Sequence, residues 1–203
     1  MGRPLFLLGM LPLYLLGVAA AWGGEQAVRP STLVAGLLLV WSIQLMTHYN
    51  NEYHDVETDR ATRTPTRVSG GSRVLVRGLV PRGAARVAAV ACLSVALALT
   101  ILLTAVLGVG NLVLVFVAAA LLIGWFYSAP PLKLDARGLG EVGIAISACL
   151  LVPYTAYYVQ SPALTISLLR VCISLALLTF ALTLATELPD LAADRATGKM
   201  TLV

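Results

Sequence analysis

The chain has 203 residues, of which 59% are hydrophobic and 12% charged, and its net charge at neutral pH is +4. Average soluble domains carry about 25% charged residues, so the composition excludes an ordinary soluble domain and indicates an integral membrane protein. The positive charge does not indicate a nucleic-acid partner, because the arginines gather in one loop and no nucleic-acid-binding motif accompanies them.

Six apolar segments follow one another along the chain, at residues 4–22, 32–49, 84–107, 110–127, 142–159 and 163–188. Each is about long enough to cross roughly 30 Å of hydrocarbon as a helix. The segments lack the two-residue alternation of barrel strands, and only helices or closed barrels satisfy their backbone groups in lipid. The sequence therefore predicts an all-α, polytopic bundle with six spans, forming a single transmembrane domain over residues 1–203. The first segment is too long for a signal-peptide core and is expected to be retained.

The basic residues predict the orientation of these spans. In a six-span arrangement all but Arg29 and Arg170 of the 14 lysines and arginines lie on one side of the membrane. The positive-inside rule assigns that side to the cytoplasm. We expect a bacterial inner (plasma) membrane protein. Its two acidic clusters, at residues 51–59 and 187–194, are both expected at the cytoplasmic face.

Two polar clusters stand at the ends of apolar segments on that side. The first holds Asn51, Asp55 and Asp59, and the second Glu187, Asp190 and Asp194. Spacing of four residues places side chains on one face of a helix, so each cluster can present converging oxygens. Mg²⁺ prefers carboxylates together with substrate phosphate oxygens, and neighbouring Arg and Lys can meet the remaining phosphate charge. The pattern predicts a site for a magnesium diphosphate.

The two clusters also carry a family resemblance. Residues 51–59, NEYHDVETD, match the NxxxDxxxD pattern of the UbiA-type membrane prenyltransferases. Residues 190–201, DLAADRATGKMT, resemble the second aspartate motif of that family. The Arg3-Pro4 pair and the segment from Tyr127 to Lys133, running into Gly138 to Glu141, add to the resemblance, which covers essentially the whole chain.

The resemblance implies transfer of a polyprenyl group from polyprenyl diphosphate to an acceptor, with Mg²⁺ as cofactor. It implies catalytic roles for Asp55, Asp59, Asp190 and Asp194, and a metal-binding set of these four with Asn51 and Glu187. Glu187 departs from the family pattern, which more often has Asn or Asp at that point. The implied diphosphate contacts are Arg60, Arg67, Lys133, Arg195 and Lys199. Tyr127 and Tyr154 are candidates for the prenyl or acceptor pocket, since aromatic faces stabilise positive charge.

The Gly70-Gly71 pair and the run from Asp194 to Thr201 are most like the relatives that prenylate 1,4-dihydroxy-2-naphthoate in menaquinone biosynthesis. Other aromatic or unrelated acceptors, namely hydroxybenzoate, haem and lipid-linked sugars, stay open, because one scaffold serves many acceptors. A transporter with ion-coupling carboxylates is the alternative class, although its charged groups belong near the membrane midplane. Relatives usually have nine spans, so the chain is expected to be truncated at its C-terminus.

Overall fold

The computed structural model describes residues 1–23, 27–62, 71–196 and 198–203, with all of their side chains except those of residues 190 and 193. The longer helices are α1 (Pro4–Trp22), α2 (Pro30–His54), α4 (Arg82–Ile101), α5 (Leu112–Phe126) and α8 (Ile166–Glu187). The shorter ones are α3 (Val56–Ala61), α6 (Gly140–Ile146), α7 (Val152–Gln160) and α9 (Leu191–Ala196). The described residues contain no strand beyond one isolated bridge between Arg137 and Met200. The all-α prediction is confirmed.

Within the described parts of the chain, five helical stretches are long and apolar enough to cross a membrane. They are Pro4–Trp22, Pro30–His54, Arg82–Val106, Gly140–Gln160 and Ile166–Glu187. Two of them contain a π-helical turn, Leu102–Val106 after α4 and Ser147–Leu151 between α6 and α7. The sixth predicted span corresponds to α5, whose 15 residues extend only about 22 Å, less than the roughly 30 Å of a hydrocarbon core. The predicted polytopic bundle is thus confirmed. Five of the six predicted spans correspond to these long stretches, and the remaining one corresponds to the shorter α5.

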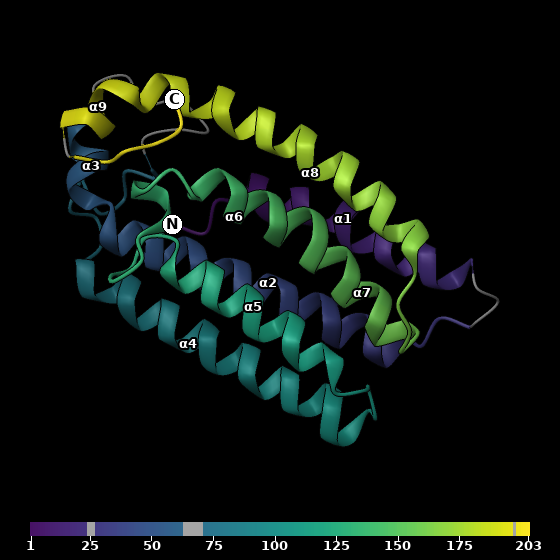
Figure 1. Cartoon of the computed structure of the whole chain (residues 1–203). Helices are drawn as coiled ribbons and strands as arrows, with labels where there is room; N and C mark the ends of the chain where they lie inside the picture. The colour runs from purple at the N-terminus through teal and green to yellow at the C-terminus, as the bar shows by residue number, and fades with distance from the viewer. Residues whose placement is uncertain (24–26, 63–70, 197) are drawn as a thin grey trace.

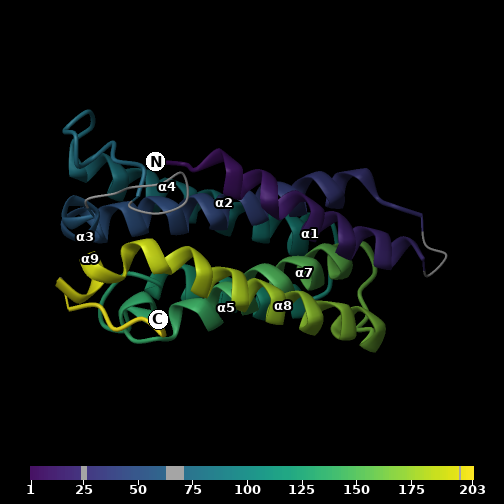
Figure 2. The same ribbon diagram turned by 90° about the horizontal axis from the view of Figure 1, so that it is seen from above.

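The helices lie side by side along one long direction, as Figure 1 shows, and both termini lie at the same end of the bundle. That end also holds α3 and α9, which contact each other although they are about 130 residues apart in the sequence. A second view, turned by 90°, again shows α3 and α9 together (Figure 2). The chain therefore brings its two acidic clusters to one end.

Glycine allows α1 to approach its neighbours closely. A Cβ at Gly17 would lie 2.1 Å from the carbonyl oxygen of Pro153 in α7. A Cβ at Gly36 in α2 would lie 2.5 Å from the hydroxyl of Tyr14, which donates a hydrogen bond to Leu33 at 2.7 Å. Small residues at such crossings are typical of membrane bundles, where packing rather than hydrophobic burial holds the helices together.

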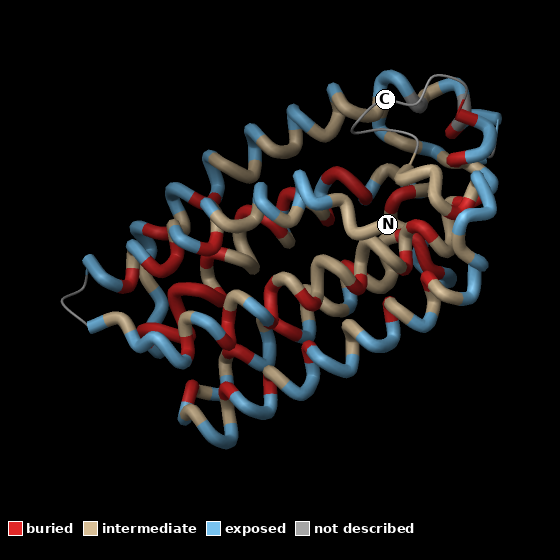
Figure 3. The backbone as a smooth tube through the Cα atoms, turned by 180° about the vertical axis from the view of Figure 1, so that it is seen from behind, coloured by how far each residue is buried: buried red, intermediate tan, exposed pale blue. Residues whose placement is uncertain are grey.

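Burial follows the bundle axis. Figure 3 shows buried residues on the inward sides of the helices and exposed residues along their outer sides. The outer face of α8 is strongly apolar, with Leu177, Leu178 and Leu182 between 63% and 68% exposed. Such faces would be unfavourable in water and suit a hydrocarbon environment.

The junction of α2 and α3 preserves the spacing of the first cluster. The amide of Asp55 donates to the carbonyl of Asn51 at 2.9 Å, and the amide of Asp59 donates to the carbonyl of Asp55 at 2.8 Å. The backbone departs from helical geometry only at Asp55, with φ −92° and ψ 9°. The three residues consequently stay close to one line along the end of the bundle.

Candidate active site

A polar cavity of about 140 Å³ opens at the end of the bundle that holds α3 and α9. Its walls come from the start of α1, the end of α2, α3, the loop after α5, the end of α8, α9 and the C-terminal segment. Its charged lining consists of Asp55, Asp59, Asp135, Glu187, Asp194, Arg3 and Lys199. Five carboxyl groups facing two basic groups make a cavity suited to cations.

The first cluster enters this cavity as a connected group. Asn51, in the last turn of α2, donates from Nδ2 to Oδ2 of Asp55 at 2.7 Å. Asn51 also contacts Arg3, whose Nη2 lies 3.4 Å from the Asn51 side-chain oxygen. All three predicted members of the cluster, Asn51, Asp55 and Asp59, line the cavity.

Asp59 is the more buried of the two aspartates of the first cluster, with 9% of its surface exposed. Burial, with the nearby negative charges of Asp55 and Glu52, raises the pKa of Asp59 to about 7. Gly71 covers it from the following loop, and a Cβ at Gly71 would lie 1.8 Å from Asp59 Oδ2. Because Gly71 also has φ +68°, only glycine fits here without strain.

Buried Glu52 holds that loop in place. Its two carboxylate oxygens accept hydrogen bonds from the amide of Ser72 at 2.9 Å and from the Ser72 hydroxyl at 2.5 Å. Arg3 lies 3.5 Å from the same carboxylate. Glu52 therefore does not line the cavity itself but holds Ser72, and with it the neighbouring Gly71, next to the first cluster.

The second cluster reaches the cavity from the opposite wall. Glu187, at the end of α8, and Asp194, in α9, both line it. Asp194 is buried, with 6% exposure, and its backbone carbonyl accepts from the Lys199 amide at 2.9 Å. The side chain of Asp190 lies outside the described residues. Side chains from both clusters thus meet in one cavity.

Lys199 joins the two walls directly. Its Nζ lies 2.9 Å from Oδ2 of Asp55 and 2.9 Å from Oδ2 of Asp135. Burial lowers the pKa of the Lys199 ammonium, but Asp55 and Asp135 raise it above its ordinary value, so Lys199 is charged. Of the four described basic residues that were predicted to contact a diphosphate, Lys199 is the one in the cavity lining.

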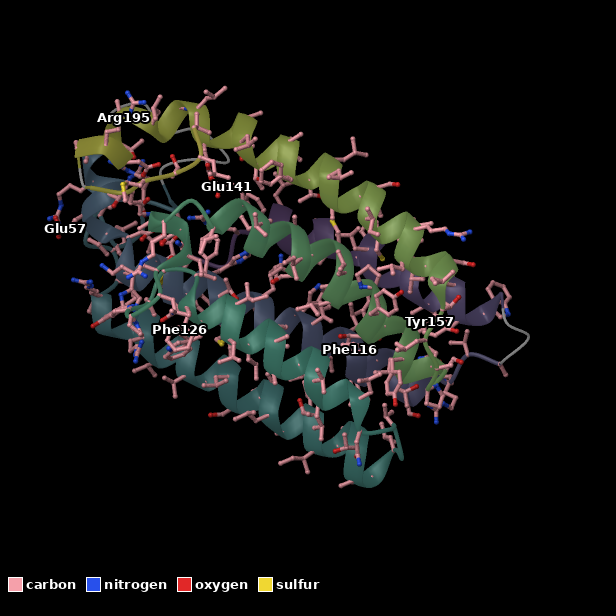
Figure 4. All side chains as sticks on the ribbon, in the orientation of Figure 1. Glu57, Phe116, Phe126, Glu141, Tyr157 and Arg195 are labelled. Carbon is pink, nitrogen blue, oxygen red and sulfur yellow. The ribbon has the colours of Figure 1, made fainter. Side chains whose placement is uncertain are left out.

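The remaining predicted basic residues do not share this position. Arg60 pairs with Glu57 at 3.0 Å on the outside of α3, and both side chains are more than half exposed. Lys133 and Arg195 are exposed and do not line the cavity. In Figure 4, Glu57 and Arg195 lie at the outer edge of the end of the bundle that holds α3 and α9, which we call the acidic end. Arg67 lies outside the described residues.

Sequence reasoning missed three residues of the cavity network. Arg3 appeared only as part of the family resemblance, and Ser128 and Asp135 were not singled out, although they lie in or just after the segment from Tyr127 to Lys133. Ser128 accepts from Asn51 at 2.8 Å and donates to Asp135 at 3.1 Å. The only sequence signal for Asp135 was an acidic residue in an otherwise basic loop.

A second, larger cavity of about 320 Å³ continues from the polar one into the bundle. Its lining is mostly apolar and includes Met10, Val40, Ile43, Val117, Ile123, Ile144 and Leu151. The two cavities share Arg3, Asn51, Tyr127 and Glu187. Tyr127, one of the two aromatic candidates for the prenyl or acceptor pocket, thus lies at the junction of the two cavities. Tyr154 lies elsewhere: its hydroxyl donates to the carbonyl of Thr165 at 2.8 Å.

The donor set of the polar cavity fits Mg²⁺ that arrives with a diphosphate. Carboxylate and amide oxygens are hard ligands, and Glu187 holds a buried carboxyl group beside that of Glu141. Among the described residues, no three acidic, histidine or cysteine side chains converge closely enough to hold a metal by themselves. Mg²⁺ commonly uses one or two carboxylates and completes its shell with phosphate oxygens and water.

Comparisons with known proteins agree with this arrangement. A solved structure of a UbiA homologue from Archaeoglobus fulgidus, bound to GPP and Mg²⁺, is similar to the chain with a TM-score of 0.69. The similarity covers 98% of this chain and 67% of that one at 20% sequence identity, so it concerns the fold. A search of curated proteins finds no match. The model of the UbiA prenyltransferase family matches residues 10–203, and the chain therefore belongs to that family.

Proposed function

We propose that this protein transfers a polyprenyl group from polyprenyl diphosphate to an aromatic acceptor, with Mg²⁺ held between the two acidic clusters. One observation carries the proposal. Carboxylates from both clusters line a single polar cavity, and that cavity continues into an apolar one of more than twice its volume. A substrate with a charged diphosphate head and a hydrocarbon tail matches both parts. The GPP and Mg²⁺ bound to the Archaeoglobus fulgidus homologue support the same substrate class.

The proposed metal-binding set is that inferred from the sequence: Asn51, Asp55, Asp59, Glu187, Asp190 and Asp194. Bound Mg²⁺ would neutralise the charge that builds on the leaving diphosphate as the carbon–oxygen bond breaks. Lys199 and Arg3 lie where they would donate to the remaining diphosphate oxygens. Arg60, Lys133 and Arg195 have a weaker case, because they lie outside the cavity lining.

The apolar cavity would protect the allylic cation from water. Tyr127 lines both cavities, so it lies near the place where the prenyl carbon would separate from the diphosphate. An aromatic face contributes about 0.5 to 2 kcal/mol to a nearby cation. We assign this role to Tyr127 and withdraw Tyr154 from it, because Tyr154 lines neither cavity.

For the acceptor we propose 1,4-dihydroxy-2-naphthoate, which would place the protein in menaquinone biosynthesis. The support is the sequence resemblance in the Gly70-Gly71 pair and in the run from Asp194 to Thr201. The positive-inside distribution supports a cytoplasmic position for the cavity in a bacterial plasma membrane. The transporter alternative is less well supported, because the carboxylates lie at one end of the bundle rather than midway along it.

The test is direct. Membranes containing the protein are incubated with Mg²⁺, a labelled polyprenyl diphosphate and a panel of aromatic acceptors, and the lipid product is identified by mass. Asp55→Asn and Asp194→Asn should each abolish turnover while expression is unchanged. The matched control is Glu57→Gln, since Glu57 is an exposed acid of the same segment that pairs only with Arg60 among the described contacts. Full turnover in both Asn variants would contradict the proposal.

A further inference from the structure

Five side chains, four that line the polar cavity and Ser128 behind them, form a closed ring of hydrogen bonds. Asn51 Nδ2 donates to Asp55 at 2.7 Å and to Ser128 at 2.8 Å, and Ser128 donates to Asp135 at 3.1 Å. Lys199 Nζ closes the ring by donating to Asp135 and to Asp55, each at 2.9 Å. The ring connects the end of α2, the loop after α5 and the C-terminal segment.

The position of Lys199 in this ring is fixed through the backbone. The Lys199 amide donates to the carbonyl of Asp194 at 2.9 Å. The next residue, Met200, donates from its amide to the carbonyl of Ala136 at 3.2 Å, beside Asp135. Two residues further, the amide of Leu202 donates to the buried carboxylate of Glu141 at 2.9 Å. The C-terminal segment is thus docked on the loop before α6, and this docking carries the ammonium to the two carboxylates.

Asp135 belongs to neither acidic cluster, and yet it is about as buried as Asp59 and Asp194, with 8% exposure. Its Oδ2 accepts both the Ser128 hydroxyl and the Lys199 ammonium. Two carboxylates therefore share one small cation at equal distances. This is an arrangement in which a divalent cation would balance the charge better than the single ammonium does.

We propose that Asp135 is a positioning residue of the site, and that Lys199, held between Asp135 and Asp55, occupies a cation position on Asp55 that Mg²⁺ takes only when diphosphate arrives. The inference rests on the proposed function. Lys199 already lines the cavity, so its ammonium can turn from Asp55 toward a bound diphosphate while Asp135 keeps it in reach.

The physical consequence is coupling between metal and diphosphate. Without diphosphate, Mg²⁺ must compete with the Lys199 ammonium for Asp55, which weakens metal binding. A diphosphate supplies new acceptors for Lys199 and frees Asp55 for the metal. Each ligand therefore improves the binding of the other by the same factor, as linkage requires.

The test uses Mn²⁺ as a spectroscopic substitute for Mg²⁺ and measures its binding to the purified full chain by electron paramagnetic resonance. In the absence of pyrophosphate, Lys199→Met should tighten Mn²⁺ binding by about tenfold, within the usual range of such couplings. The enhancement of Mn²⁺ binding by pyrophosphate should shrink by the same factor. Lys199→Gln provides a second variant in case the first does not fold.

The control is Arg77→Met, which removes the same charge from an exposed position outside the cavity and should leave the Mn²⁺ dissociation constant within about twofold of wild type. Mn²⁺ binding to Lys199→Met that equals or falls below wild type would overturn the inference. Asp55→Asn distinguishes a failure of the proposed metal site from a failure of the inference about Lys199. If Asp55→Asn retains Mn²⁺ binding, the proposed metal site itself fails; if it loses binding and Lys199→Met gives no gain, only the inference fails.

The positioning role of Asp135 has its own readout. In Asp135→Asn, Lys199 loses one of its two anchors, so the KM for prenyl diphosphate should rise severalfold with kcat little changed, the pattern of lost uniform binding. Asp135→Glu should recover part of the loss because it restores a carboxylate. A fall in kcat at unchanged KM would overturn the positioning role.

Discussion

Single residues decide the geometry of the polar cavity more than secondary structure does. Asp59 is buried beneath Gly71, and Glu52 holds Ser72 from behind. The members of the first cluster could be predicted from the sequence, because the helical hydrogen bonds continue across Asp55 and keep residues four positions apart on one side. The partners that hold them were not visible, because Gly71 and Ser72 reach them through the fold of a loop.

Replacing Gly71 by alanine should impair diphosphate binding. The new Cβ would lie 1.8 Å from Asp59 Oδ2 and would have to push that carboxylate aside. Gly78→Ala is the matched control, since Gly78 has the same φ of +68° but no atom within 4 Å of the position that a Cβ would take. Both variants bear the backbone strain, and only Gly71→Ala bears the collision. Equal affinities for Mg²⁺-pyrophosphate in the two variants would show that the Gly71 contact is unimportant.

The metal-free protein should lose stability through Asp59 as the pH rises from about 4 to 7. The pKa of Asp59 is about 7 in the folded protein and about 3.9 in an unfolded chain, so the folded state binds the proton more tightly. This contribution is fully present below pH 4 and is lost as the pH rises through 7. The difference of about three pKa units corresponds to a cost of about 4 kcal/mol at pH 8. If Asn recovers about 1 kcal/mol of this cost, Asp59→Asn should raise the Tm at pH 8 by about 2 to 4 °C in a protein of this size. A Tm difference between the two proteins that is the same at pH 5 and pH 8 would contradict this assignment.

At the scale of elements, the helices were predictable and their ends less so. The bounds of α1 are those predicted from the apolar segment 4–22, because lipid allows few alternatives to a helix. The second span continues five residues beyond its predicted end at Tyr49, since polar residues at the water interface can extend a helix. The docking of the C-terminal segment could not be predicted. Lys199 and Asp55 are 144 positions apart, and the sequence around either residue does not indicate that they are in contact.

The crossing of α1 and α7 gives an element-scale prediction. Gly17→Leu should destabilise the bundle by about 1 to 3 kcal/mol, because the side chain would collide with the Pro153 carbonyl and force the helices apart. Gly9→Leu in the same helix is the control, as nothing lies within 4 Å of its Cβ position. Thermal unfolding in detergent measures both. A Tm for Gly17→Leu equal to that of Gly9→Leu would mean that the crossing tolerates more separation than the structure indicates.

The whole molecule places the acids at one end and a mainly apolar cavity behind them. The sequence predicted the shared end from charge distribution alone, because clusters on the same side of the membrane can meet. It included Lys199 among five predicted basic contacts, but it did not distinguish Lys199 from the others and assigned no such contact to Arg3. Arg60 and Arg195 follow aspartates directly in the sequence, yet both are exposed, whereas Arg3 and Lys199 come from opposite ends of the chain and line the cavity.

The proposed orientation can be tested by cysteine labelling in intact cells. The segment before α4 lies at the end of the bundle that holds α3 and α9, and the loop between α7 and α8 lies at the other end. Arg77 belongs to the first of these segments and Ala163 to the second, and both are exposed. In a Cys92→Ala background, a membrane-impermeant maleimide should label Ala163→Cys directly and Arg77→Cys only after permeabilisation. Cys149 and Cys172 are buried and should react slowly. The reverse labelling pattern would place the acidic end outside.

The central claim is that the two acidic clusters act as one binding site. Its most direct test is a double-mutant cycle on Mg²⁺-pyrophosphate binding, measured by calorimetry for Asp55→Asn, Asp194→Asn and the double variant. We predict that each single change weakens binding at least about tenfold. The loss of affinity in the double variant should be much smaller than the product of the two single losses, with a coupling of about 1 to 3 kcal/mol. Independent, multiplicative effects, or wild-type affinity in either single variant, would contradict the account.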